Sequence, residues 1–148
     1  LVDSIVKVTG VPEKLGDLPP GTTAISLGDS RVPSVPLDLL GRCSRDGECS
    51  PAAAAAGSLP LTLHTINGPW LNAKLSDPAG RLVKLLSEKP AGQVVAELYR
   101  IALGRQPTPS EADCWQSEIR RVRVGEQIEL IQDLVWAMLN STEFTPNH

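Results

Sequence analysis

Proline and glycine are distributed unevenly along the chain, and this asymmetry limits what each half can fold into. The 148 residues include 12 glycines and 13 prolines, and 16 of these 25 lie between residues 1 and 69. Proline lacks an amide donor and glycine is costly to order, so this density leaves room only for short elements. Residues 70–148 hold the other nine, and longer helices are expected there.

The amino-terminal part predicts one short helix followed by an irregular arm. Apolar residues recur with helical spacing over residues 1–6, and Gly10 ends the pattern. In the arm, the alternation over residues 22–27 predicts a short strand. Residues 35–40 are compatible with a second strand or with a single helical turn. Because the chain opens inside a helical pattern and without methionine, we interpret it as the carboxy-terminal piece of a longer protein.

Beyond residue 69 the apolar periodicity predicts helices joined by short loops. Thr108, Pro109 and Glu111 form the pattern of a capping box with proline at the first helical position. Gly104 stands where a helix end favours glycine, and Asp77 before Pro78 is typical of a helix start. The predicted helices cover residues 70–75, a segment from Pro78 through Leu86, and residues 91–103, 109–122 and 126–140.

These patterns together predict a mainly α fold. We expect a small helical bundle over residues 59–148, forming one compact unit. Residues 1–58 are expected to contribute a helix stub and the irregular Pro/Gly-rich arm, with at most one or two short strands.

Composition excludes several classes of function. The formal net charge of −3 argues against a nucleic-acid binder that neutralises many phosphates. Aromatic residues make up 3% of the chain, too few for a base-stacking platform or an aromatic sugar cleft. No run approaches the roughly 18 apolar residues of a membrane span, so membrane insertion is not expected.

The three cysteines do not match a known metal or haem spacing. Cys43 and Cys49 are separated by five residues, which is neither a zinc knuckle nor a C-x-x-C motif. They can close a small disulfide loop if the protein is exported, or remain two thiols in a turn. Cys114 precedes Trp115 on a predicted helix, and we expect it to be a small buried apolar residue.

The remaining polar residues do not form a catalytic pattern. His64 lies in an apolar stretch and is expected to pack, and His148 is the last residue. Phosphate-binding glycine loops and a nucleophile elbow are absent from the sequence. Arginines at positions 120, 121 and 123 fall at a predicted helix end, where we expect paired surface charges. We therefore predict that the chain has no catalytic residue, cofactor or metal ligand, and that it is not an enzyme.

Several segments, in this order, carry a family resemblance: LVDSIVKVTGVP (1–12), HTINGPWLNAKL (64–75), ELYRIALGRQPTPSE (97–111) and DLVWAMLNSTEF (133–144). The chain resembles the carboxy-terminal half of a planctomycete-specific domain of unknown function, number fifteen-fifty-three in that series. The family often has a Cys-Glu-Cys-Glu-Arg run, which Cys43 and Cys49 match only in part. The motif residues to which the resemblance implies a structural role are Asn67, Gly68, Asn72, Tyr99, Arg105, Trp136, Asn140, Glu143 and Phe144.

The resemblance implies a position at the end of large exported proteins, which often also carry a planctomycete-type cytochrome c domain. We therefore expect export to the periplasm or cell surface, and a non-catalytic structural or protein-interaction domain. Its partners would be other domains of the parent protein, reached through loop residues such as Asp29, Arg31 and Arg42.

The alternative is an accessory part of a redox or polymer-degrading enzyme. Its active site would then lie mostly in the rest of the parent chain. The residues that would contribute on this alternative are Cys43, Glu48, Cys49, His64 and Asn67.

The motif residues also suggest how the helices are tied together. Tyr99 and Leu103 are expected to pack inward, and Phe144 to close the core from the last turn. Arg105 can reach helix-end carbonyls or a carboxylate such as Glu143, and we predict an ion pair of Arg105 with Glu143.

Overall fold

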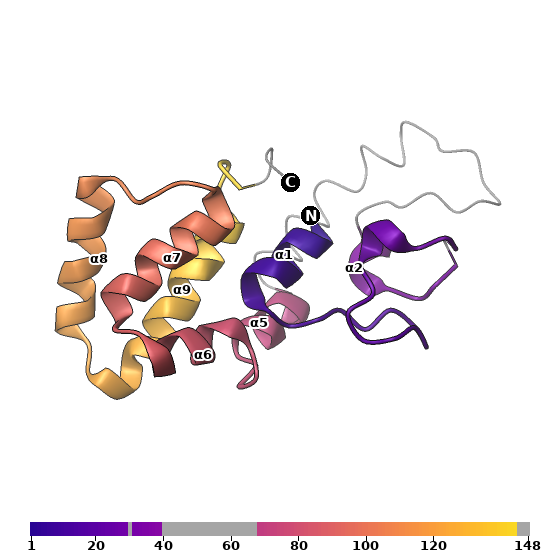
Figure 1. Cartoon of the computed structure of the whole chain (residues 1–148), viewed down its shortest axis with the longest axis horizontal. Helices are drawn as coiled ribbons and strands as arrows, with labels where there is room; N and C mark the ends of the chain where they lie inside the picture. Colours follow the sequence, from indigo (N-terminus) through magenta and orange to yellow (C-terminus); the bar gives the residue numbers. More distant parts are fainter. Residues whose placement is uncertain (30, 40–67, 145–148) are drawn as a thin grey trace. The chain divides into compact units, whose positions relative to one another are not determined.

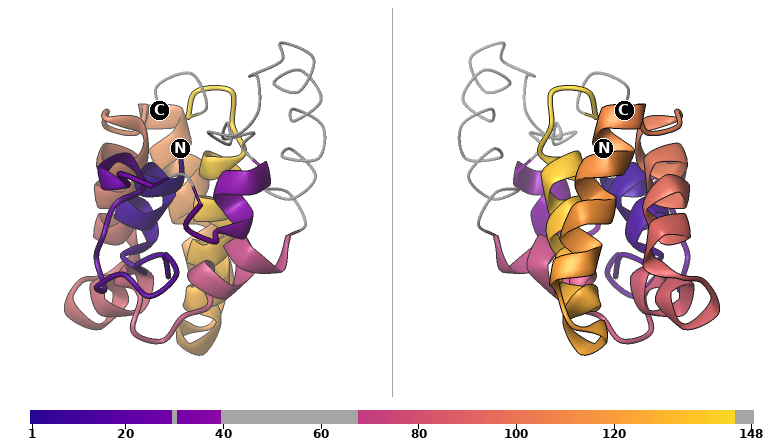
Figure 2. Two further views of the ribbon diagram at one scale, coloured as in Figure 1. Left: turned by 90° about the vertical axis from the view of Figure 1, so that its right-hand side faces the viewer. Right: turned by 90° about the vertical axis from the view of Figure 1, so that its left-hand side faces the viewer.

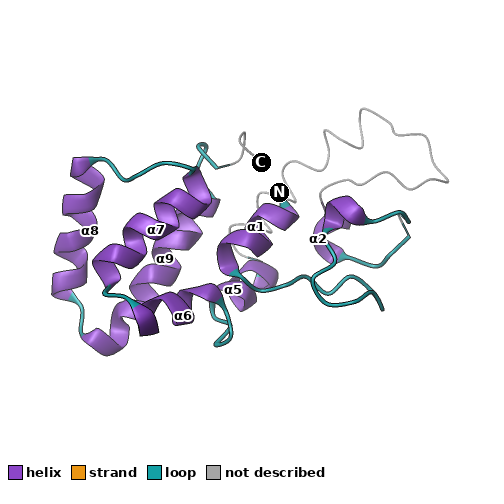
Figure 3. Ribbon diagram, viewed as in Figure 1, coloured by secondary structure: helices purple, strands orange, loops and turns teal. Residues whose placement is uncertain are grey.

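The computed structural model describes residues 1–29, 31–39 and 68–144. Their contacts divide the chain into two units, one made of Leu1, Asp3–Val11 and the chain from Ala73 onward, the other of Val2 and Pro12–Asn72. Within the described ranges the chain consists of helices and loops without a strand, which confirms the predicted mainly α fold (Figures 1 and 3). The expected domain boundary between residues 58 and 59 lies outside the described residues.

The first unit is built from helices, and the three longest begin and end within one residue of their predicted bounds. None of the helices among the described residues has the length and apolar character needed to cross a membrane. The elements are α1 (Val2–Thr9), α6 (Arg81–Glu88), α7 (Ala91–Leu103), α8 (Pro109–Arg121), the 3₁₀ turn η2 (Val124–Glu126) and α9 (Gln127–Leu139), while α5 (Pro69–Leu75) begins in the second unit and ends in the first.

The core of the first unit lies where α7 and α9 pack on each other and on α6. Val94 and Leu98 of α7 and Ile131 and Val135 of α9 are fully buried. Phe144, in the turn after α9, is also fully buried, which confirms that it closes the core from the last turn. Burying side chains of this size stabilises a fold by about 1.5–3 kcal/mol each.

Both helix ends that the sequence marked with glycine are confirmed. Gly10 ends α1 with φ 70° and Gly104 ends α7 with φ 70°, a left-handed conformation that favours glycine. At the start of α8 the Thr108 hydroxyl accepts a hydrogen bond from the Glu111 amide at 3.3 Å, and the Glu111 carboxylate accepts one from the Thr108 amide at 2.7 Å. This reciprocal pair is the predicted capping box.

The helix start predicted at Asp77 and Pro78 is wrong. The Asp77 carboxylate accepts a hydrogen bond from the Ala79 amide at 2.8 Å, and the Asp77 carbonyl accepts one from the Gly80 amide at 2.9 Å. These bonds close a separate turn, and α6 begins only at Arg81. An Asp-Pro pair in a sequence is compatible with a turn and with a helix cap, because in both structures the Asp side-chain oxygen accepts a hydrogen bond from a backbone amide.

In the second unit the described elements are short. The strand expected over residues 22–27 is wrong, because residues Ala24–Ser26 form a 3₁₀ turn, η1, in which the Ser26 amide and hydroxyl both donate to the Thr23 carbonyl. Residues Val35–Leu39 form helix α2, so the helical alternative is correct there. The indole of Trp70 donates to the Glu13 carboxylate at 2.8 Å, which ties the start of α5 to the beginning of the arm.

Candidate functional site

Arg105, in the loop between α7 and α8, joins three parts of the first unit. Its Nε and Nη2 donate to the two carboxylate oxygens of Glu143 at 2.6 and 2.9 Å. Its Nη1 and Nη2 donate to the two carboxylate oxygens of Glu111 at 2.8 and 2.9 Å. The predicted ion pair with Glu143 is therefore confirmed, and a second bidentate pair with the first turn of α8 accompanies it.

The guanidinium of Arg105 has no donor left for a ligand. A guanidinium carries five N–H groups, and four of them serve the two carboxylates. The fifth, on Nη1, donates to the Gln106 carbonyl at 3.0 Å. Arg105 together with Glu111 and Glu143, which we call the arginine latch, consequently fastens the chain and does not present an open anion site.

The latch holds its acidic members ionised. Hydrogen bonding from Arg105, with a second bond from the Thr108 amide, lowers the pKa of Glu111 to about 2. Hydrogen bonding from Arg105 also lowers the pKa of Glu143, and the two carboxylates raise the pKa of the guanidinium above its ordinary value. About a third of the Arg105 side chain remains exposed, so solvent screens these attractions.

The latch also positions an aromatic pair. The Arg105 guanidinium lies 5.2 Å from the centre of the Tyr99 ring, within the range of a cation–π contact. The Tyr99 hydroxyl in turn accepts a hydrogen bond from the indole of Trp115 at 3.3 Å. Burial raises the pKa of Tyr99 above its ordinary value.

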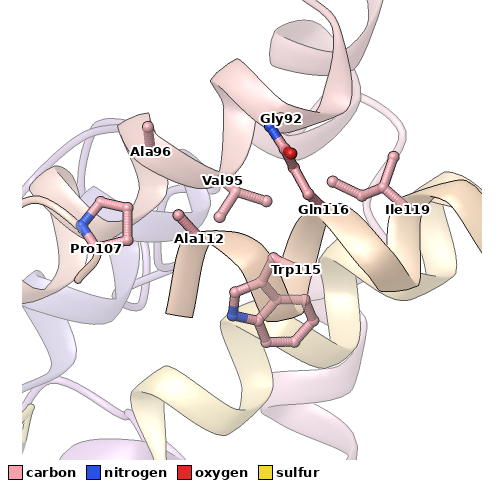
Figure 4. A pocket seen from close by; sticks show the side chains of 8 residues that line it. All are labelled: Gly92, Val95, Ala96, Pro107, Ala112, Trp115, Gln116 and Ile119. Carbon is pink, nitrogen blue, oxygen red and sulfur yellow. The ribbon is translucent and has the colours of Figure 1, made fainter. Parts of the chain in front are cut away.

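Trp115 forms one side of an open apolar groove between α7 and α8 (Figure 4). The groove encloses about 70 Å³, far below the roughly 300 Å³ of a small-molecule site, and has room for a single side chain. In Figure 4 Pro107 and Ile119 lie at opposite ends of it, and the Gln116 side chain ends beside Gly92. The residues that line the groove are Gly92, Val95, Ala96, Pro107, Ala112, Trp115, Gln116 and Ile119.

The groove exists because α8 is poorly covered. The views of the first unit in Figures 1 and 2 place α8 at its outer edge, and its main packing partner is α7. The helical spacing of Ala112, Trp115 and Ile119 predicts a buried face, but these residues are only half-buried, and α8 has no buried side chain. The expectation for Cys114 is wrong, because its side chain is exposed on the outer face of α8.

The other motif residues that the structure describes act at helix ends. The Asn140 side chain donates to the Trp136 carbonyl at 2.8 Å, and the Ser141 hydroxyl donates to the Met138 carbonyl at 2.7 Å. The Ser141 hydroxyl also accepts a hydrogen bond from the Phe144 amide at 3.2 Å. These bonds end α9 and turn the chain so that Phe144 enters the core.

Two motif residues lie at α5, Gly68 directly before its first residue and Asn72 within it. Gly68 is buried, and the Asn72 amide donates to the Gly68 carbonyl at 3.4 Å, while the Asn72 side chain is exposed. Lys74, buried on the same helix, donates from Nζ to the Val11 carbonyl at 3.1 Å and so ties α5 to the end of α1.

Several candidate residues lie outside the described part of the chain: Arg42, Cys43, Glu48, Cys49, His64, Asn67 and His148. The disulfide between Cys43 and Cys49 and the redox alternative therefore stay predictions. Across residues 1–29, 31–39 and 68–144, no three histidine, cysteine or acidic side chains gather as metal ligands would.

Sequence reasoning missed the groove and the second carboxylate of the latch. The sequence contains a signal for the groove. Gly92 and Ala96 lie four residues apart on α7, and Ala112 and Gln116 lie four residues apart on α8. Three of these four residues are small. The sequence predicts only a capping role for Glu111. A cap occupies one of its carboxylate oxygens, and the other oxygen can still accept hydrogen bonds from a second partner such as Arg105. No protein-family model, curated protein or solved structure matches this chain.

Proposed function

We propose that this chain is a non-catalytic protein-interaction domain, placed by its resemblance at the carboxy-terminal end of a large exported bacterial protein. Its partners on this proposal are other domains of that protein or a protein that the parent binds. The observation that carries the proposal is the half-exposed apolar groove between α7 and α8. A groove of this size and lining suits one apolar side chain of a protein segment.

The arginine latch supports the same function. Because every donor of Arg105 is used within the chain, the latch contributes rigidity and not substrate binding. It fixes Trp115 through Tyr99 before any partner arrives. A docking surface that is ordered in advance loses less conformational entropy on binding.

Selection from a random displayed-peptide library on the immobilised full chain tests the proposal, followed by Kd measurements on the enriched peptides. Gly92→Trp places an indole across the groove, and a Cβ at Gly92 meets no atom within 4 Å, so α7 itself is not strained. Gly28→Trp is the matched control, because a Cβ at Gly28 also meets no atom within 4 Å and Gly28 lies in the second unit.

We expect enriched peptides to bind Gly92→Trp at least about tenfold more weakly, the loss of one anchor contact, and to bind Gly28→Trp as they bind the original chain. Circular dichroism confirms that both variants keep their helices. Peptides that bind Gly92→Trp undiminished, or a selection that enriches none, would contradict the proposed function.

A further inference from the structure

A basic tip lies at the end of α8. It consists of residues 120–125, which run from the last two residues of α8 into η2, ahead of α9 (Figure 1). Three of its residues are arginines, at positions 120, 121 and 123, and Val124 between them and α9 is 83% exposed. An exposed valine among cations gives this tip both apolar and positive surface.

Two of the three guanidinium groups are not neutralised by the described residues around them. Arg121 donates to the Glu118 carboxylate at 2.6 Å, so its charge is compensated. Arg120 contacts only an amide, the Gln116 side-chain oxygen, at 3.4 Å. Arg123 uses its backbone amide to reach the Glu126 carboxylate at 3.2 Å, and its guanidinium is in no ion pair with a described residue. The tip is therefore locally positive on a chain whose net charge is −3.

The basic tip begins beside the groove. Gln116 and Ile119 line the groove, and Arg120 is hydrogen-bonded to Gln116 and follows Ile119 in the chain. A segment that places an apolar side chain in the groove consequently has its neighbouring residues beside Arg120. Carboxylates at those positions would meet uncompensated guanidinium groups, whereas lysine or arginine would be repelled.

We propose that the groove is a docking site for an acidic protein segment: one apolar side chain enters the groove, and carboxylates next to it pair with Arg120 and Arg123. This inference rests on the proposed function and adds the chemistry of the partner. The charge of the tip supplies orientation and selectivity, and the groove supplies the apolar anchor.

The experiment uses the enriched peptides and the full chain. Arg120→Glu combined with Arg123→Glu reverses the tip without entering the groove lining. The matched control is Lys14→Glu combined with Lys84→Glu, which changes the net charge equally at two exposed positions outside both the tip and the groove lining. Vesicles of phosphatidylcholine with phosphatidylserine serve as a second probe, because lipid headgroups also attract a basic tip.

We expect the groove-binding peptides to be rich in Asp and Glu beside an apolar residue. Reversal of the tip should weaken their binding about tenfold at low salt, and the matched control should weaken it less than about twofold. The difference between the two variants should shrink in 1 M salt, where the Debye length is about 3 Å. Peptides that need the groove but lack acidic residues and ignore the reversed tip overturn this inference and leave the proposed function intact. Vesicle binding that needs the tip and ignores Gly92→Trp also overturns it, because the tip would then serve a membrane surface.

Discussion

Gly10 and Gly104 offer a matched test of how closely α1 approaches the start of α6. Both residues end a helix at φ 70°, with ψ of 11° and 8°, so alanine meets nearly the same backbone strain at each. A Cβ at Gly104 meets no atom within 4 Å. A Cβ at Gly10 would lie 2.8 Å from the Arg81 Cβ and 3.1 Å from the Arg81 backbone nitrogen. Any difference between the two alanine variants therefore reports the contact with α6.

The magnitudes follow from these two terms. Left-handed backbone costs a non-glycine residue about 1–2 kcal/mol, and the stiffer unfolded chain returns about 0.4–1 kcal/mol. Gly104→Ala should therefore lower the free energy of unfolding by about 1 kcal/mol. Gly10→Ala adds the crowding against Arg81, about 1–3 kcal/mol for an overpacked site, and should lose about 2–4 kcal/mol.

Urea denaturation followed by helical circular dichroism measures both losses, with the slope of the transition checked for each variant. The crowding involves the backbone of α6, which cannot rotate away as a long side chain can. Equal losses for the two variants would refute the reasoning, because they would mean that α1 does not lie against the first turn of α6 in solution.

Two further predictions concern the arginine latch. The first is a double-mutant cycle of Arg105→Ala and Glu143→Ala, the two partners of a bidentate contact. Each single variant should lower Tm by a few degrees, and the double variant should lower Tm by less than the sum of the two single shifts. Additive shifts would show that the bidentate contact contributes no stability. Glu111 has a folded-state pKa of about 2 against an ordinary value of 4.5, so its contribution is complete above about pH 5 and is lost as the pH falls toward 2. Urea midpoints measured across this window should fall less steeply for Glu111→Gln than for the original chain, and parallel profiles would contradict the role of the carboxylate.

Local signals in the sequence were sufficient to locate most helices. The capping box at Thr108 and the glycine at position 104 each act through bonds within a few residues, so their structure depends little on the rest of the fold. The ion pair between Arg105 and Glu143 was also predicted, from the reach of an arginine among the motif residues that carry the resemblance.

The degree to which each helix is covered could not be predicted in the same way. Trp115 and Ile119 repeat with the spacing of a buried face, and periodicity indicates which side of a helix is apolar. It does not indicate how many neighbours lie over that side, so the spacing alone predicts a core face where the structure has a half-open groove. The strand expected over residues 22–27 failed for a related reason: alternation over so few residues is outweighed by hydrogen bonds that Thr23 accepts locally.

Gly10, Gly104 and Gly92 differ in whether backbone conformation or close packing requires a glycine at that position. Gly10 is required by a close approach and by its backbone, and Gly104 by its backbone. Gly92 has neither requirement, because it lies within α7 at ordinary backbone angles and a Cβ there would meet open space. Gly92 is the second residue of α7, and the conformation there does not require glycine. Gly92 lines the groove, where any larger side chain would reduce the space open to an incoming one. On the proposed function, the absence of a side chain at Gly92 keeps the groove open to its occupant.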